Sequence, residues 1–301
     1  MTQPETIDVK MHGHDGLTAA FLVTGGKTAL VETGPKSSVE NVLRGLESMR
    51  VERLDYIVVT HVHLDHAGAA GTLAARWPDA TVAVHEVGAP HLADPSKLWS
   101  SAARIYGDDM ERLWGGIDPV SHERILALRD GDRIDLGGRV LQAFDTPGHA
   151  YHHHAFLDDA TGVLFAGDAL GVLLPDIGLV RPATPPPEFN LEAAVDSIRR
   201  IRELEPASVW LTHFGQAGRP PPEVCDEATE AMQAWAKWVD EGRATSRDLD
   251  EITAVVRERA RNRFEDRLSE EQLTRLEQTT SYRLNTSGYV RYLDKKDAKR
   301  S

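Results

Sequence analysis

Short apolar runs alternate with amphipathic stretches along the first two thirds of the 301-residue chain. The apolar runs have the length of strands, and they predict strands in residues 19–31, 54–60, 81–84, 139–145, 162–165 and 208–211. The first of these runs contains Gly25-Gly26 and should fold as two strands joined by a hairpin turn. Apolar residues at helical spacing predict helices over residues 38–49 and 191–201, the second capped by Asn190. This alternation is typical of an α/β protein with a layered core.

Two segments interrupt the alternation. Residues 92–117 are polar with scattered tryptophan and glycine, and we expect them to form a helical insertion that covers a site. Residues 182–187 contain four prolines, which cannot continue a helix or a central strand. This second segment is therefore predicted to be a loop.

The pattern becomes purely helical after Gly215. Residues 220–222 are all proline and break the chain, and three helical stretches follow them. The first carries an apolar stripe and should end at Gly242, and the third should begin with a capping box at Ser269. The basic residues in 289–301 predict a solvated tail.

We accordingly expect two domains, with a boundary near residue 216. Residues 1–215 would form the catalytic domain and residues 216–301 a helical C-terminal extension. The extension would either cover one face of the core or shape a substrate pocket or dimer contact. Polar and aromatic residues near its end could reach a neighbouring site in a homodimer: Arg283, Asn285, Tyr289 and Tyr292.

Composition narrows the classes of function. A formal net charge of −13 repels nucleic-acid phosphates, so no nucleic-acid partner is expected. The single cysteine, Cys225, excludes a disulfide within the chain and a thiolate zinc cluster. The N-terminal sequence lacks a signal-peptide pattern, and no apolar run of about 18 residues predicts a membrane span. We therefore expect a cytoplasmic protein that is not associated with membranes.

The densest group of chemically capable side chains directly follows the apolar run 54–60. The sequence Thr-His-Val-His-Leu-Asp-His-Ala-Gly contains four potential metal ligands within six positions: His61, His63, Asp65 and His66. His61 and His63 are two residues apart, so in an extended segment they face the same side. Such a loop cannot easily aim four ligands at one ion, but two neighbouring ions can share them. Imidazole and carboxylate ligands without thiolates suit zinc, iron or manganese.

Three more candidate ligands stand at the ends of later apolar runs: His149, Asp168 and His213. A lone histidine at a strand end is more often structural than functional. Ligands delivered from several strand ends to one edge of a sheet, however, form a rigid set. The prediction of a metal site therefore depends on all seven residues together.

The order His-x-His-x-Asp-His, followed by separate His, Asp and His residues, resembles the signature of the metallo-β-lactamase superfamily, including its glyoxalase II-like branch. The resemblance covers roughly residues 17–215. It implies a four-layer αβ/βα sandwich with the metals at one edge. Carried over by position, it implies a first metal held by His61, His63 and His149, and a second held by Asp65, His66 and His213. Asp168 would bridge the two metals.

One position departs from the family pattern. The family often has Asp-Thr-Gly near the second strand, where this chain has Glu32-Thr33-Gly34. That aspartate supports the metal loop through hydrogen bonds, and Glu32 is one methylene longer, so the same bonds are not assigned to it. We still expect Glu32 to act beside the ligands or on the substrate.

The histidines outside the seven candidate ligands are not predicted to bind metal. Of the three that follow His149, His153 is our first choice for a contact with the ligands or the substrate, and His152 and His154 either touch the site or face solvent. The remaining ones have no partners by spacing and are predicted to be surface or packing residues: His85, His91 and His122.

The resemblance implies hydrolysis of an ester, thioester, lactone or amide by two divalent ions, with zinc expected and iron or manganese as alternatives. The ions would share a bridging hydroxide that attacks the substrate, while Asp65 orients this nucleophile and then protonates the leaving atom.

Within the family, the branches differ in how well they fit. True β-lactamases lack the bridging aspartate, and acyl-homoserine lactonases carry a tyrosine shortly after it, where this chain has Ala169-Leu-Gly-Val172. The basic and aromatic thiol-binding pattern of glyoxalase II is not found. The alternative outside hydrolysis is a mononuclear iron, persulfide dioxygenase-like oxidoreductase, because that branch keeps much of the motif. Flavodiiron proteins usually have glutamate where His63 stands here.

Overall fold

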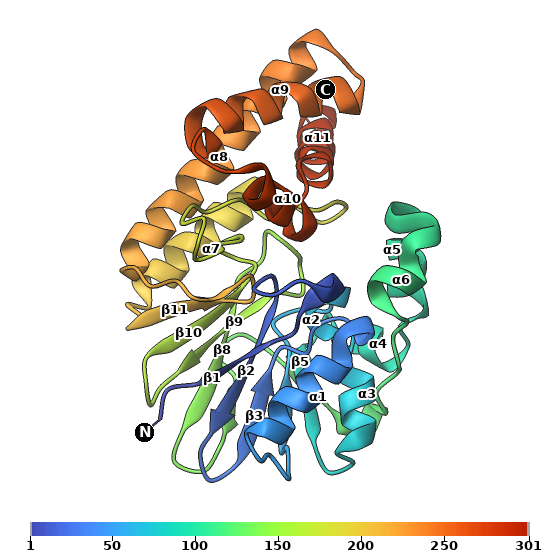
Figure 1. Cartoon of the computed structure of the whole chain (residues 1–301), viewed down its shortest axis with the longest axis vertical. Coiled ribbons are helices and arrows are strands. Elements are labelled where there is room, and N and C mark those ends of the chain that lie inside the picture. Colours follow the sequence, from blue (N-terminus) through green and yellow to red (C-terminus); the bar gives the residue numbers. More distant parts are fainter. Residues whose placement is uncertain (1, 300–301) are drawn as a thin grey trace.

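The apolar runs form two β-sheets in the computed structural model, which describes residues 2–299 (Figure 1). The first sheet pairs its strands in chain order: β1 (Glu5–Asp8), β2 (Ala19–Thr24), β3 (Thr28–Val31), β4 (Tyr56–Val58), β5 (Thr81–His85) and β6 (Ile125–Leu128). The second sheet also pairs sequential neighbours: β7 (Arg133–Asp135), β8 (Val140–Asp145), β9 (His154–Asp158), β10 (Val163–Gly167), β11 (Ser208–Leu211) and β12 (Gly215–Gln216). The strands that the apolar pattern missed, β1, β6, β7, β9 and β12, are short and mostly mix charged or polar residues with apolar ones.

The two sheets pack face to face through apolar side chains from both. Phe21 of β2 lies against Phe165 of β10 and Trp210 of β11, with ring centroids 5.3 and 5.5 Å apart. All three rings are buried. Each buried ring contributes roughly 25 cal/mol per Å² of apolar surface removed from water. The core between the sheets therefore holds the two strand layers at a fixed spacing.

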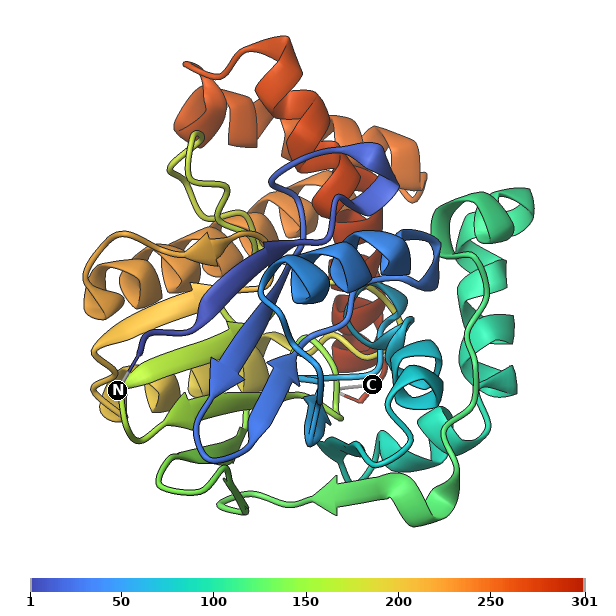
Figure 2. The ribbon, with the colours of Figure 1, turned by 60° about the horizontal axis from the view of Figure 1, so that its bottom comes forward.

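Helices cover the outer face of each sheet (Figures 1 and 2). The first sheet is covered by α1 (Val39–Ser48) and α3 (Ala70–Arg76), and the second by α7 (Leu191–Glu203). Asn190 begins α7 as predicted, since its side chain accepts a hydrogen bond from the Ala193 amide at 3.0 Å. The resulting architecture is the four-layer αβ/βα sandwich expected from the sequence.

The C-terminal extension consists of α8 (Pro221–Thr245), α9 (Leu249–Ala260), a π-helical turn (Arg261–Glu265), α10 (Glu270–Thr279) and α11 (Tyr282–Ala298). The capping box at Ser269 opens α10 as predicted. The prolines at 220–222 lie at the start of α8, where the first turn has no intrahelical N–H bond to lose. One apolar cluster runs from β10 and β11 through α7 into α8, α9 and α11. The division at residue 216 stays a prediction.

Two expectations for the extension were wrong. Gly242 does not end its helix, which continues to Thr245; a Cβ at Gly242 would lie 3.0 Å from Ile252 Cγ2, so the glycine allows α9 to approach closely. The predicted basic tail is largely the helix α11, in which Tyr289 is fully buried and donates a hydrogen bond to Met232 O at 2.9 Å. Basic side chains face outward on this helix, while its tyrosines pack inward.

The insertion predicted at 92–117 is helical. It contains α5 (Ser96–Tyr106) and α6 (Met110–Trp114), which follow α4 (Ala89–Ala93) and stand apart from the C-terminal helices on the same side of the molecule (Figure 1). Within residues 2–299, none of the helices combines the length and apolar character that crossing a bilayer requires.

Candidate metal centre

The seven predicted ligands come together at one edge of the sandwich. His61 and His63 lie on the turn after β4, and Asp65 and His66 lie on the short helix α2 (Leu64–Ala67) that follows. The remaining three come from the loop after β8, the end of β10 and the end of β11: His149, Asp168 and His213. All of these strand ends meet at one edge, as expected for ligands delivered by separate strands.

Gly167 places Asp168 where the cluster needs it. Its φ of +51° is in the left-handed region, and a Cβ there would lie 2.6 Å from His153 Nε2 and 2.7 Å from Thr60 Oγ1. Only glycine fits so close an approach without displacing its neighbours. The strand β10 can therefore turn sharply and direct Asp168 into the cluster.

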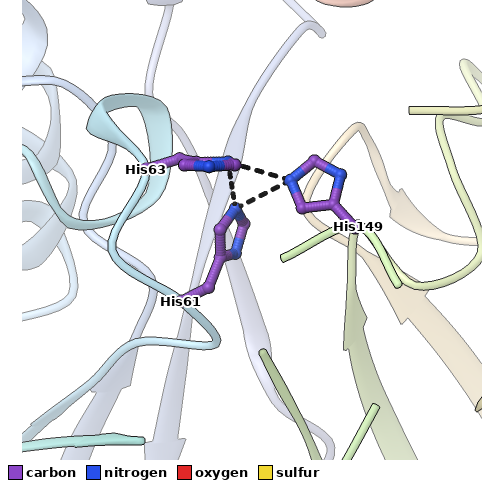
Figure 3. A group of neighbouring side chains, drawn as sticks. All are labelled: His61, His63 and His149. Carbon is purple, nitrogen blue, oxygen red and sulfur yellow. Dashed lines mark hydrogen bonds between the residues drawn. The ribbon is translucent and has the colours of Figure 1, made fainter. Parts of the chain in front are cut away.

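Three imidazoles, here called the imidazole trio, point their nitrogens at one another: His61, His63 and His149 (Figure 3). His63 Nδ1 lies 2.9 Å from both His61 Nε2 and His149 Nε2, and the latter two atoms are 3.2 Å apart. Three nitrogens bound to one zinc ion at about 2.0–2.1 Å in tetrahedral geometry would lie roughly 3.3 Å apart. The trio thus has nearly the spacing of one metal's ligand set.

Burial shapes the charge state of the trio. Removal from water, followed by the neighbouring imidazoles, holds the pKa of His61 and of His63 well below the ordinary value. Both rings are therefore neutral at physiological pH. Neutral imidazole is the form that binds a metal ion.

A second group, here called the carboxylate half, comprises Asp65, His66 and His213. Asp65 Oδ2 lies 3.4 Å from His213 Nε2 and 3.7 Å from His66 Nε2. Although burial opposes ionisation, the carboxylates of Asp168, Glu32 and Asp65 raise the pKa of His66 well above its ordinary value. Against the same burial cost, the adjacent His66 lowers the pKa of Asp65.

Asp168 lies between the two groups. Its Oδ2 is 3.4 Å from His149 Nε2 of the imidazole trio, and its Oδ1 is 3.4 Å from His66 Nε2 of the carboxylate half. Within residues 2–299, Asp168 Oδ1, His66 Nε2 and His213 Nε2 are buried and make no hydrogen bond. Unsatisfied polar atoms of this kind are costly, and a cation among them would satisfy all three. The cluster therefore has the ligand set and the unsatisfied atoms that suit a bound metal ion.

Hydrogen bonds on the far side of each ring fix which nitrogen faces the cluster. Since a carbonyl can only accept, His149 Nδ1 donates to Ala183 O at 2.9 Å and His213 Nδ1 donates to Leu17 O at 2.7 Å. In the neutral form of each ring, Nε2 therefore carries no proton and faces the cluster.

Glu32 hydrogen-bonds to the metal loop, although its extra methylene meant that these bonds were not predicted from the sequence. Its Oε1 accepts from the Thr60 amide and its Oε2 from His66 Nδ1, each at 3.2 Å. Its backbone has a φ of +67°, which brings the longer side chain back under the metal loop. The structure therefore places Glu32 behind His66 rather than at the substrate.

His153 supports Asp168. It is buried, accepts a hydrogen bond from the Asp168 amide on Nε2 at 3.1 Å, and faces Thr146 Oγ1 with Nδ1 at 2.7 Å. The neighbouring His152 lines the cavity beside the trio, and burial lowers its pKa to about 3.

The prediction that His85 has no partner was wrong. His85, Asp145 and His154 form a separate cluster, in which His154 Nε2 donates to Asp145 Oδ1 at 2.7 Å and His85 Nε2 lies 3.4 Å from the same oxygen. His85 Nδ1 accepts from the Val87 amide at 3.0 Å, so its proton is on Nε2, facing the carboxylate. The ligand atoms of these three side chains lie within 4.8 Å of one another, close enough to hold a metal ion. No spacing in the sequence joins these three strand ends.

A cavity of about 350 Å³ opens beside the cluster. Its floor includes His63, Asp65, His149 and Asp168, and its walls come from α5, α6, the loop 183–188 and the facing ends of α10 and α11. His91, predicted to be an ordinary surface residue, also lines it. Both the insertion and the C-terminal extension thus help to build the cavity.

A layered α/β fold with a buried His and Asp cluster at one sheet edge defines a class of metal-binding enzymes. A sequence profile of the metallo-beta-lactamase superfamily matches residues 14–213. Because this match covers more than half of the chain, the protein belongs to the metallo-beta-lactamase superfamily.

Individual relatives are distant. The metallo-beta-lactamase fold-containing protein ST1585 of Sulfurisphaera tokodaii is 29% identical over 221 residues, which are 72% of this chain and 78% of that protein. The crystal structure of ST1585 from Sulfolobus tokodaii matches with a TM-score of 0.71 and 23% identity, covering 96% of this chain and 99% of that one.

Two relatives have names that describe reactions. A hydroxyacylglutathione hydrolase of Synechococcus sp. is 28% identical over 194 residues, or 64% of this chain and 62% of that protein. The coenzyme F420H(2) oxidase of Methanothermobacter marburgensis is also 28% identical, over 158 residues that cover 50% of this chain and 34% of the oxidase.

Proposed function

We propose that the protein is a binuclear metal-dependent hydrolase of an ester, thioester, lactone or amide. The imidazole trio would hold one divalent ion, the carboxylate half would hold a second, and Asp168 would bind both. The position of Asp168 carries this proposal, since its two oxygens face different groups, each at 3.4 Å from a ring nitrogen. Nitrogen and oxygen donors without sulfur suit zinc first, with iron or manganese as alternatives.

When bound, such ions supply an activated water and polarise the substrate carbonyl. Asp65 lines the cavity, where its carboxylate would orient the attacking water and relay its proton. The same carboxyl would then pass the proton to the leaving atom. His66 and His213 flank Asp65 and hold it in place.

A small-molecule substrate suits the enclosed cavity. The names of two relatives point in different directions, one to a thioester of glutathione and the other to an oxidase. The complete carboxylate half favours hydrolysis with two ions over the alternative of a single iron and dioxygen. We therefore rank an acyl thioester or ester first among the substrates.

Metal analysis and a substrate panel test the proposal. Protein prepared without chelator should contain about two equivalents of metal, and it should hydrolyse at least one of a short-chain thioester, ester, lactone or amide. The same preparation should consume no oxygen with glutathione persulfide. A firm value of one iron per chain together with oxygen uptake would establish the dioxygenase instead.

A further inference from the structure

The loop 182–184 is where the C-terminal extension meets the imidazole trio. His149 Nδ1 donates to Ala183 O at 2.9 Å, and this bond turns His149 Nε2 towards the other two rings. The direction of the Ala183 carbonyl therefore sets the direction of the ring. A carbonyl on a loop without regular secondary structure keeps one direction only if the peptide groups around it are held.

Asn285 of α11 holds the peptide groups on both sides of Ala183. Its Oδ1 accepts from the Thr184 amide at 2.9 Å, and its Nδ2 donates to Pro182 O at 2.6 Å. The side chain is 1% exposed, so these bonds do not compete with bulk water. One amide thus holds the peptide group that carries the Ala183 carbonyl and the peptide group before it.

The contact is tightened by two further residues. Thr280 Oγ1 donates to Pro182 O at 2.8 Å and lies 2.6 Å from Asn285 Nδ2. At Gly288 a Cβ would lie 1.8 Å from Thr184 O, so only glycine allows the α11 backbone to pack directly on the loop. The arrangement is specific to this register of α11 against the loop.

Asn285 also lines the cavity, where it could instead contact substrate. Its hydrogen-bonding capacity argues against that role. Both donor hydrogens of its amide are used, by Pro182 O and Thr280 Oγ1, and its oxygen already accepts from Thr184. Little capacity remains for a ligand.

We propose that Asn285 is a positioning residue for the first metal site: it holds the 182–184 loop so that the Ala183 carbonyl orients His149 in the imidazole trio. This inference rests on the proposed function, since it assumes that the trio binds a metal ion. It makes the C-terminal extension part of the metal centre although the extension supplies no ligand.

The test compares Asn285→Ala with Ser287→Ala in the full chain. Ser287 lies two residues further along α11 and donates to Leu284 O at 2.7 Å, so Ser287→Ala removes a side-chain hydrogen bond of the same helix outside the loop contact. Each protein is stripped of metal and titrated with Co²⁺ against a chelator, and the visible absorption of cobalt is recorded at each step. Repeating the titration in a His213→Ala background isolates the trio.

Asn285→Ala should weaken cobalt binding at the trio by about 10- to 100-fold, the range typical for loss of an outer-shell partner, and should alter the cobalt spectrum of that step. Binding at the carboxylate half and all binding in Ser287→Ala should change less than about threefold, because their supports are intact. Unchanged trio affinity in a folded Asn285→Ala protein, or equal losses at both steps, would overturn the inference.

If Asn285→Ala does not fold, Thr280→Val provides the test. This substitution removes one donor to Pro182 O and nearly conserves the shape of the side chain. It should shift the same binding step in the same direction, and no shift would overturn the inference. The parent chain separates the two proposals. If the parent binds one ion and not two, the proposed function is wrong, and the inference fails with it only when that ion does not bind at the trio. If the parent binds two ions and the variants match it, only the inference is wrong.

Discussion

The imidazole trio and the carboxylate half are neighbours in one cluster, but their surroundings give their histidines different charge states. The trio has no carboxylate among its members, and burial keeps the pKa of His61 and His63 low. In the carboxylate half, His66 faces carboxylates on three sides, and its pKa is raised. Without metal, His61 and His63 of the trio are neutral donors, whereas His66 of the carboxylate half is ion-paired and must lose a proton before it binds a cation.

The hydrogen bonds behind His149 of the trio and His66 of the carboxylate half also differ. His149 is oriented by the carbonyl of Ala183, a neutral acceptor, and His66 by the carboxylate of Glu32. A carboxylate behind a ligating imidazole makes the ring more basic and a stronger ligand. This stronger support belongs to His66 alone of the two histidines in the carboxylate half, because His213 Nδ1 donates to the neutral Leu17 carbonyl.

Removing Asp168 should have the largest effect, because its two oxygens face different groups. Asp168→Ala should weaken both metal-binding steps and reduce hydrolysis by several orders of magnitude, since the activated water depends on the paired ions. Steady-state kinetics and metal analysis measure this. Asp196→Ala, an exposed carboxylate on α7, is the control and should behave like the parent. Near-normal metal content and turnover in Asp168→Ala would show that Asp168 does not bridge the two groups.

Removing one ligand from each group should separate them. His149→Ala should weaken metal binding at the trio, and His213→Ala should weaken it at the carboxylate half. Each loss of affinity should exceed the roughly 10- to 100-fold typical of outer-shell changes. Cobalt titrations of the two variants should therefore each lack a different step. If both variants lose the same step, the division into two groups is wrong.

Glu32→Gln should have a smaller effect, confined to the carboxylate half. Glutamine has one acceptor oxygen, so it cannot serve both the Thr60 amide and His66 Nδ1. We expect binding at that half to weaken by about 10-fold or more while the trio changes little. Glu40→Gln, on the exposed side of α1, removes the same charge away from the site and should have no effect. A loss at the trio alone would contradict this assignment.

The ligand cluster could be predicted because its members stand in recognisable local sequence patterns. Four of them lie within six positions, and the others follow apolar runs whose ends meet at one sheet edge. Their supports could not be predicted in this way. The bond from His149 to Ala183 O joins residues 34 positions apart, and Asn285 reaches Thr184 across 101 positions. No periodicity in the chain encodes such contacts.

The extension was harder to predict for a related reason. The buried face of α11 is built from residues that are usually ranked as polar or aromatic, so it lacked the aliphatic stripe by which α8 was recognised: Tyr282, Asn285, Thr286, Gly288, Tyr289 and Tyr292. Its exposed lysines and arginines dominated the pattern and suggested a tail. The same face carries Asn285, so the helix that was misread is also the one that contacts the site.

Acidification should produce the smallest and most graded difference between the two groups. In the metal-free chain, carboxylates raise the pKa of His66 and His213 despite burial, so protons compete with metal there at pH values above the ordinary histidine value of about 6.5. For His61 and His63, whose pKa is lowered, that competition begins only well below this value. As pH falls, metal should therefore leave the carboxylate half first. Equilibrium dialysis from pH 8 to pH 4 should give two steps, from two equivalents to one and then to none. His213→Ala protein should lack the step at higher pH. A single concerted release, or loss from the trio first, would mean that the charge difference between the two groups does not govern metal affinity.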